Sequence, residues 1–193
     1  MDKKNIRHQM LQKLNTMNIE NHARLSREII QHVIQLDAYK NAKTIGVTIS
    51  RFPEVDTRPF IEAAWEAGKK IVVPKCIRET RAMDFRLITS FEQLETVYID
   101  LLEPIVNETS SVRKEDIELQ IVPGVVFSKD GYRIGFGGGY YDRYMADYKG
   151  ETISLAFNCQ TTEVVPTEHH DIPVNTIITE KKIIDCQRNR KSS

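Results

Sequence analysis

The chain lacks long apolar runs and an excess of either charge. No stretch of its 193 residues approaches the roughly 18–20 apolar positions that a membrane-spanning helix needs. Residues 1–10 contain no apolar segment typical of a secretory signal. The 27 basic residues balance 27 acidic ones, which argues against a nucleic-acid or anionic-membrane partner. We therefore expect a cytoplasmic protein that binds neither nucleic acid nor membranes.

Cysteines are also few, since only Cys76, Cys159 and Cys186 are present and no Cys-x-x-Cys pair occurs. Their odd number and wide spacing argue against a disulfide framework or a structural zinc site, so we expect reduced, inert thiols. The apolar fraction of 40% and the charged fraction of 28% are typical of an ordinary globular domain. We expect one domain over residues 1–186, followed by a flexible basic tail over residues 187–193 that has nothing apolar to bury.

Hydrophobic periodicity predicts alternating helices and strands. Apolar positions at helical spacing indicate two amphipathic helices within residues 2–36. A further helix should begin at Thr57, which can serve as its N-cap, and end at Gly68, which can adopt the left-handed conformation. Strands are expected over residues 44–50, 70–74, 83–88, 119–127, 152–157 and 176–179.

The order strand, helix, strand between residues 44 and 74 predicts a parallel pair with a right-handed crossover. Residues 119–127 form the most apolar run and are the best candidate for a central strand. We therefore predict an α/β fold with an open, mainly parallel sheet. In such folds ligands bind beyond the carboxyl ends of the strands.

The most distinctive motif is a glycine-rich loop within residues 133–143, which read Arg-Ile-Gly-Phe-Gly-Gly-Gly-Tyr-Tyr-Asp-Arg. Glycine offers no side chain for packing and costs backbone entropy, so this density indicates a loop that exposes backbone N–H groups. Ahead of a helix predicted over residues 140–148, such a loop favours phosphate binding. The glycines alone would also suit a flexible turn, and neither a Walker ending nor Gly-x-Gly-x-x-Gly spacing is present. Arg133 before the glycines and Tyr-Tyr-Asp after them favour the phosphate-binding interpretation.

Residues 123–143, above all their Gly-Gly-Gly-Tyr-Tyr-Asp block, resemble the signature of the 5-formyltetrahydrofolate cyclo-ligase family, also called 5,10-methenyltetrahydrofolate synthetases. Residues 3–7, 53–57 and 170–173 resemble three further segments of that family in the same order, so the resemblance spans about residues 3–185. It implies a single-domain, three-layer α/β/α fold that is Rossmann-like and similar to that of phosphosugar isomerases and CoA-transferases.

The resemblance also implies an activity. The family converts 5-formyltetrahydrofolate to 5,10-methenyltetrahydrofolate through a phosphorylated formyl intermediate, with ATP as co-substrate, Mg²⁺ as cofactor, and ADP and phosphate as products. We therefore expect ATP and 5-formyltetrahydrofolate as partners, and a monomer or weak homodimer. Two alternatives stay open, because a fold does not fix a chemistry: a nucleotide-sensing binding module without turnover, or a phosphosugar isomerase or transferase on a similar sheet.

The family's motifs place candidate residues in three sites. The residues expected to bind ATP are Lys3, Arg7, Arg133, Gly135, Gly137, Gly138, Gly139, Tyr140 and Tyr141. The residues expected to bind the folate are Ile49, Glu54 and Tyr140, and those expected to hold Mg²⁺ are Asp142 and Asp171.

Elementary chemistry suits these assignments but leaves alternatives. Lys3 and Arg7 lie one helical turn apart and can reach a phosphate together, although a solvated basic face would show the same spacing. Glu54 follows the first strand and can accept hydrogen bonds from a pterin, or be a surface acid. Carboxylates such as Asp171 suit Mg²⁺, whereas the adjacent His169 and His170 lack the further ligands of a zinc site.

Overall fold

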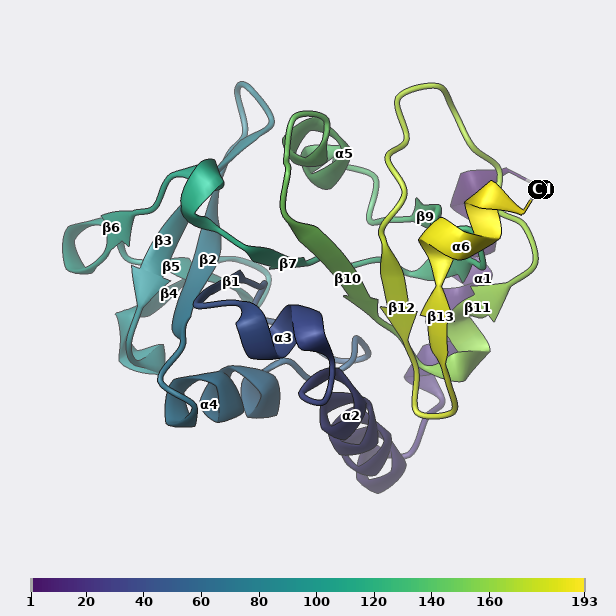
Figure 1. Ribbon diagram of the computed structural model, residues 1–193, viewed down its shortest axis with the longest axis horizontal. Coiled ribbons are helices and arrows are strands. Elements are labelled where there is room, and N and C mark those ends of the chain that lie inside the picture. Colours follow the sequence, from purple (N-terminus) through teal and green to yellow (C-terminus); the bar gives the residue numbers. More distant parts are fainter. Residues whose placement is uncertain (1, 193) are drawn as a thin grey trace.

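An eight-stranded sheet forms the centre of the computed structural model, which describes residues 2–192 (Figure 1). Its strands follow the order β13 (Ile183–Asp185), β12 (Thr176–Ile178), β10 (Glu151–Leu155), β7 (Leu119–Ile121), β1 (Thr44–Gly46), β2 (Lys70–Ile77), β3 (Ala82–Ile88) and β6 (Ser110–Ser111). The strands from β12 to β2 are parallel, whereas β13, β3 and β6 pair antiparallel at the edges. The predicted open, mainly parallel sheet is confirmed.

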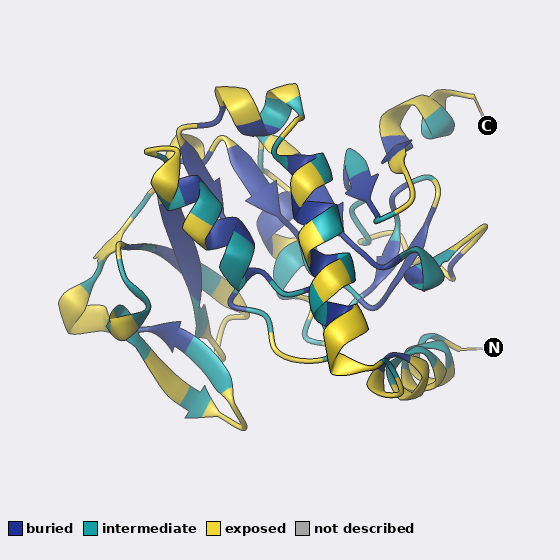
Figure 2. Cartoon of the chain, turned by 90° about the horizontal axis from the view of Figure 1, so that it is seen from below, coloured by how far each residue is buried: buried dark blue, intermediate teal, exposed yellow. Residues whose placement is uncertain are grey.

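Helices cover both faces of this sheet, which makes the three layers of the expected α/β/α fold. One face packs against α2 (Ile19–Val33), α3 (Asp37–Asn41) and α4 (Arg58–Glu66). The opposite face packs against α5 (Tyr140–Met145) and α6 (Cys186–Lys191). Figure 2 shows buried and exposed residues alternating along the helices, while the strands behind them are buried. Within residues 2–192, no helix combines the length and apolarity needed to cross a membrane.

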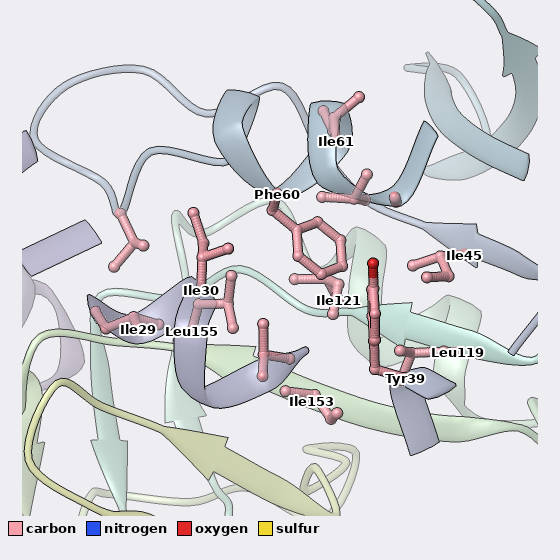
Figure 3. Close-up of a cluster of buried hydrophobic side chains, with 14 of the residues drawn as sticks. Ile29, Ile30, Tyr39, Ile45, Phe60, Ile61, Leu119, Ile121, Ile153 and Leu155 are labelled. Atoms are coloured by element: carbon pink, nitrogen blue, oxygen red, sulfur yellow. The ribbon is translucent and has the colours of Figure 1, made fainter. Parts of the chain in front are cut away.

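The larger core lies between α2–α4 and the sheet (Figure 3). Fully burying one large aliphatic or aromatic side chain stabilises a fold by about 1.5–3 kcal/mol, so this layer is a major source of stability. The helices contribute Ile29, Ile30, Tyr39, Phe60 and Ile61, and the strands contribute Ile45, Leu119, Ile121, Ile153 and Leu155.

The prediction of one strand over residues 119–127 is wrong, because the chain leaves the main sheet after β7. Pro123 has no N–H group to donate to a strand ladder. The chain then enters β8 (Val126–Ser128), which pairs with β9 (Arg133–Ile134) and β11 (Thr161–Thr162) in a separate sheet. Helix α1 (Lys3–Asn15), purple in Figure 1, packs on this second sheet and contacts β8.

The strand predicted over residues 44–50 is shorter, because β1 ends at Gly46. The Thr57 hydroxyl donates to the Thr48 carbonyl at 2.7 Å and accepts from the Ser50 amide at 3.0 Å. These bonds tie the chain after β1 to the start of α4 rather than to a neighbouring strand. Thr57 occupies the predicted N-cap position, but its side chain caps no amide of α4. Gly68 ends this helix with a φ of 75°, as predicted.

Three smaller features complete the chain. Helix α6 lies where the sequence predicts a frayed tail, and Arg190 donates to the carbonyls of Asp130 at 2.5 Å and Val174 at 3.0 Å. Mobility of the tail stays a prediction. A hairpin of β4 (Leu94–Tyr98) and β5 (Leu101–Pro104) extends beside β2. Short 3₁₀ helices span Phe91–Gln93, Val106–Glu108, Lys114–Asp116 and Asn158–Gln160.

The close packing of β1 against β7 generates a stability prediction. A Cβ atom on Gly46 would lie 2.3 Å from Oε1 of the fully buried Gln120. We expect Gly46→Ala to lower the free energy of unfolding by about 1–3 kcal/mol, measured by urea denaturation followed by circular dichroism. Gly135→Ala is the control, because a Cβ there meets nothing within 4 Å. Equal stability of the two variants would contradict this packing.

Candidate functional site

A cavity of about 460 Å³ opens at the edge of the sheet where the parallel strands end. Its wall includes residues that follow β1 and β7, together with the glycine loop and the start of α5. Every residue predicted for the three sites lines this cavity: Lys3, Arg7, Ile49, Glu54, Arg133, Gly135, Gly137, Gly138, Gly139, Tyr140, Tyr141, Asp142 and Asp171. The structure thus brings the predicted residues together, while their individual roles stay predictions.

The glycine loop takes a conformation that favours glycine at two positions. Gly137 has a φ of 99° and Gly139 a φ of 71°, both in the left-handed region that side chains disfavour. Gly139 directly precedes α5, which is shorter than the helix predicted over residues 140–148. The Nε atom of Arg7 donates to the Gly135 carbonyl at 2.6 Å. Helix α1 therefore supplies a cation that contacts the loop directly.

An ion pair between the buried Arg133 and the partly exposed Asp142 closes this loop. The Arg133 side chain is 4% exposed, and its guanidinium donates to Asp142 Oδ1 at 3.2 Å and to the Ile172 carbonyl at 2.8 Å. Asp142 Oδ1 also accepts from the Ile172 amide at 3.0 Å. Burial lowers the pKa of Arg133, and the adjacent carboxylate opposes that effect. Arg133 and Asp142, which flank the glycines in the sequence, thus bond to each other and to the backbone of Ile172.

Lys3 reaches the other acidic residues of the cavity. Its ammonium lies 2.6 Å from Asp171 Oδ2 and 2.9 Å from Glu168 Oε2. Burial alone would lower the pKa of Lys3, but the hydrogen bonds and charges of the two carboxylates outweigh it and raise that pKa. Burial alone would raise the pKa of Asp171, but the hydrogen bonds from Lys3 and from the Glu168 amide outweigh it and hold that pKa below its ordinary value.

The same carboxylates provide the best donor set for a cation. Among residues 2–192, the ligand atoms of Glu168, His170 and Asp171 lie within 4.8 Å of one another. Carboxylate oxygens are the protein ligands that Mg²⁺ prefers, and this group already holds the ammonium of Lys3, so the residues fit a hard cation. Asp142 is not a member of this group.

Another part of the cavity lining combines carboxylates with apolar side chains. Glu54 accepts from the Arg51 amide at 3.0 Å, and burial raises its pKa above the ordinary value. The nearby Ile49 is buried. The sequence missed Glu103, a buried carboxylate on β5 that accepts from the Cys76 amide at 2.9 Å. A ligand with both ring atoms and hydrogen-bond donors would suit this wall.

Other cavity residues were also missed, because only tertiary contacts place them there. Leu101 and Leu102 come from the β4–β5 hairpin, and Glu168 stands beside the metal-ligand candidates. No local motif marks any of them in the sequence. Cys76 lines the cavity as well, and burial raises its pKa to about 11, so its thiol is protonated and weakly nucleophilic at neutral pH.

Comparison with known proteins gives a consistent result. The mouse 5-formyltetrahydrofolate cyclo-ligase is 30% identical over 189 residues, covering 92% of this chain and 93% of its own. The cyclo-ligase of Escherichia coli K12 is 32% identical over 147 residues, covering 74% and 80% of the two chains. The solved 5,10-methenyltetrahydrofolate synthetase of Aquifex aeolicus has a TM-score of 0.85 at 31% identity, covering 97% of this chain and 94% of that one.

The family comparison covers almost the whole chain. Residues 1–180 match the model of the 5-formyltetrahydrofolate cyclo-ligase family. This span contains the glycine loop, α1 and every predicted site residue. The resemblance inferred from the glycine motif is confirmed, and the chain belongs to the 5-formyltetrahydrofolate cyclo-ligase family.

Proposed function

We propose that the protein converts 5-formyltetrahydrofolate to 5,10-methenyltetrahydrofolate at the expense of ATP. The observation that carries the proposal is the single cavity at the carboxyl edge of the sheet. It brings together a glycine loop, two basic side chains of α1, several carboxylates and apolar residues. Such a cavity suits a polyphosphate and a pterin side by side, and membership of the cyclo-ligase family supports both ligands.

The proposed reaction explains the need for two ligands in one cavity. An N-formyl group is a poor electrophile because its nitrogen donates electrons into the carbonyl. In the first step the formyl oxygen bonds to the γ-phosphorus of ATP, and the bond to ADP breaks. The N10 nitrogen then attacks the formyl carbon and loses its proton, and phosphate departs with the former formyl oxygen. The protein's task is to align the reactants and offset phosphate charge.

The residues divide between these tasks. We assign the backbone of Gly135–Gly139 and the side chain of Arg7 to the phosphates, and Glu54 with Ile49 to the pterin. Arg133 serves ATP indirectly, because its guanidinium is already engaged with Asp142. A Mg²⁺ ion would be held by the carboxylates of Asp171 and Glu168, and would supply positive charge to the phosphates.

A direct assay tests this function. Purified protein, Mg-ATP and 5-formyltetrahydrofolate are mixed, and the near-ultraviolet absorption band of methenyltetrahydrofolate is followed. We expect the band to grow only with both substrates present, together with one ADP per product. ATP binding without the band would instead indicate a nucleotide-sensing module. Neither binding nor the band would favour the isomerase or transferase alternative.

The ion pairs of Lys3 generate a second prediction. Because its ammonium occupies the carboxylates proposed for the metal, Lys3→Met should strengthen binding of Mn²⁺, used as a probe for Mg²⁺, in the nucleotide-free protein. We expect the Mn²⁺ affinity to increase about two- to fivefold, which corresponds to the free energy of a partly exposed ion pair. Affinity for a non-hydrolysable ATP analogue should fall in the same variant.

Calorimetry measures both affinities. Lys4→Met is the matched control, because Lys4 is exposed on the same helix and lies outside the cavity. We expect this variant to match the unaltered protein in both titrations. Weaker Mn²⁺ binding by Lys3→Met would show that Lys3 does not compete for the metal ligands.

A further inference from the structure

Tyr141 lines the cavity and carries a buried hydroxyl group. Among the described residues, the Tyr141 hydroxyl is shielded from solvent and forms no hydrogen bond, although Tyr141 lines the cavity. Most buried polar groups in folded proteins are hydrogen-bonded, because leaving one unpaired costs free energy. An unpaired hydroxyl at a ligand cavity therefore points to a partner that arrives with the ligand.

The surroundings of Tyr141 fix its ring in place. Tyr141 belongs to the first turn of α5, directly after the glycine loop, and packs against the core on that face of the sheet. Its neighbour Tyr140 differs, since the Tyr140 ring lies 5.8 Å from the guanidinium of Arg81. A ring held by packing can present its hydroxyl in one direction at little entropic cost.

Tyr141 lines the cavity together with residues assigned to both ligands. Glu54, assigned to the pterin, and the glycine loop, assigned to the phosphates, line the same cavity. Tyr141 follows the last glycine of that loop by two residues. Burial raises the pKa of Tyr141 well above its ordinary value, so the hydroxyl stays protonated and able to donate at neutral pH.

We propose that the Tyr141 hydroxyl donates a hydrogen bond to the formyl oxygen of the folate substrate. This inference rests on the proposed function, which requires the formyl group to lie where the two ligands meet. An amide-type carbonyl oxygen is a good acceptor with two lone pairs. One lone pair accepts from Tyr141, and the other stays available for the phosphorus of ATP. Tyr141 is then a positioning residue that selects a carbonyl-bearing group at N5.

A pair of ligands and a pair of variants test this assignment. The affinities of 5-formyltetrahydrofolate and 5-methyltetrahydrofolate are measured by calorimetry without ATP, so that no turnover occurs. The methyl compound carries a substituent at the same nitrogen but has no oxygen there. We expect Tyr141→Phe to weaken binding of the formyl compound by about three- to tenfold, the effect of one neutral hydrogen bond. Binding of the methyl compound should change by less than about twofold.

Tyr144→Phe is the matched control. Tyr144 lies one turn further along α5, and its hydroxyl is also buried and unpartnered among the described residues, but Tyr144 does not line the cavity. We expect this variant to bind both folates as the unaltered protein does. Equal weakening of both ligands by Tyr141→Phe, or no weakening of either, would overturn the assignment. The thermal midpoint of each variant shows whether it is folded at the temperature of the titration.

The outcome separates this inference from the proposed function. If the unaltered protein produces methenyltetrahydrofolate but Tyr141→Phe shows no selective loss, only the role of the hydroxyl is wrong. If the selective loss appears but no product forms, the hydroxyl does contact the formyl group and the proposed reaction is wrong. The ratio of the two affinities is measured on a single preparation, so the fraction of active protein does not affect it.

Discussion

The ion pair between the buried Arg133 and the partly exposed Asp142 is the constraint on which the site depends. A guanidinium that is 4% exposed needs a charged partner, because an unpaired buried charge is strongly destabilising. The two residues stand on either side of the glycines, so their contact closes the loop at its base. Both also bond to the backbone of Ile172, which places Asp171 beside the same loop. One interaction thus joins β9, α5 and the segment that leads to β12.

Helix α1 completes this arrangement from the far end of the chain. Lys3 and Arg7 project from one face of the helix, and the first contacts Asp171 while the second contacts Gly135. The ammonium of Lys3 therefore balances the charge of Asp171 and Glu168 in the cavity. In the proposed reaction the same lysine is free to move to a phosphate when another cation takes its place.

Local patterns in the sequence predicted much of the fold and named residues that the structure brings together around one cavity, although their roles stay predictions. The glycine loop was recognisable because its chemistry depends on consecutive residues, and the spacing of Lys3 and Arg7 follows from one helical turn. The break after β7 and the cavity wall from the β4–β5 hairpin were not predictable, because they depend on contacts between distant segments. The engagement of Arg133 with Asp142 was missed for the same reason: each residue alone suited a ligand.

A double-mutant cycle on Arg133 and Asp142 tests this account most directly. Affinity for a non-hydrolysable ATP analogue is measured by calorimetry in the unaltered protein, in Arg133→Met, in Asp142→Asn and in the double variant. If the pair acts by closing the loop, each single variant should lose about tenfold or more in affinity, and the double variant should lose no more than either. Losses that multiply in the double variant would show instead that the two residues meet the nucleotide independently.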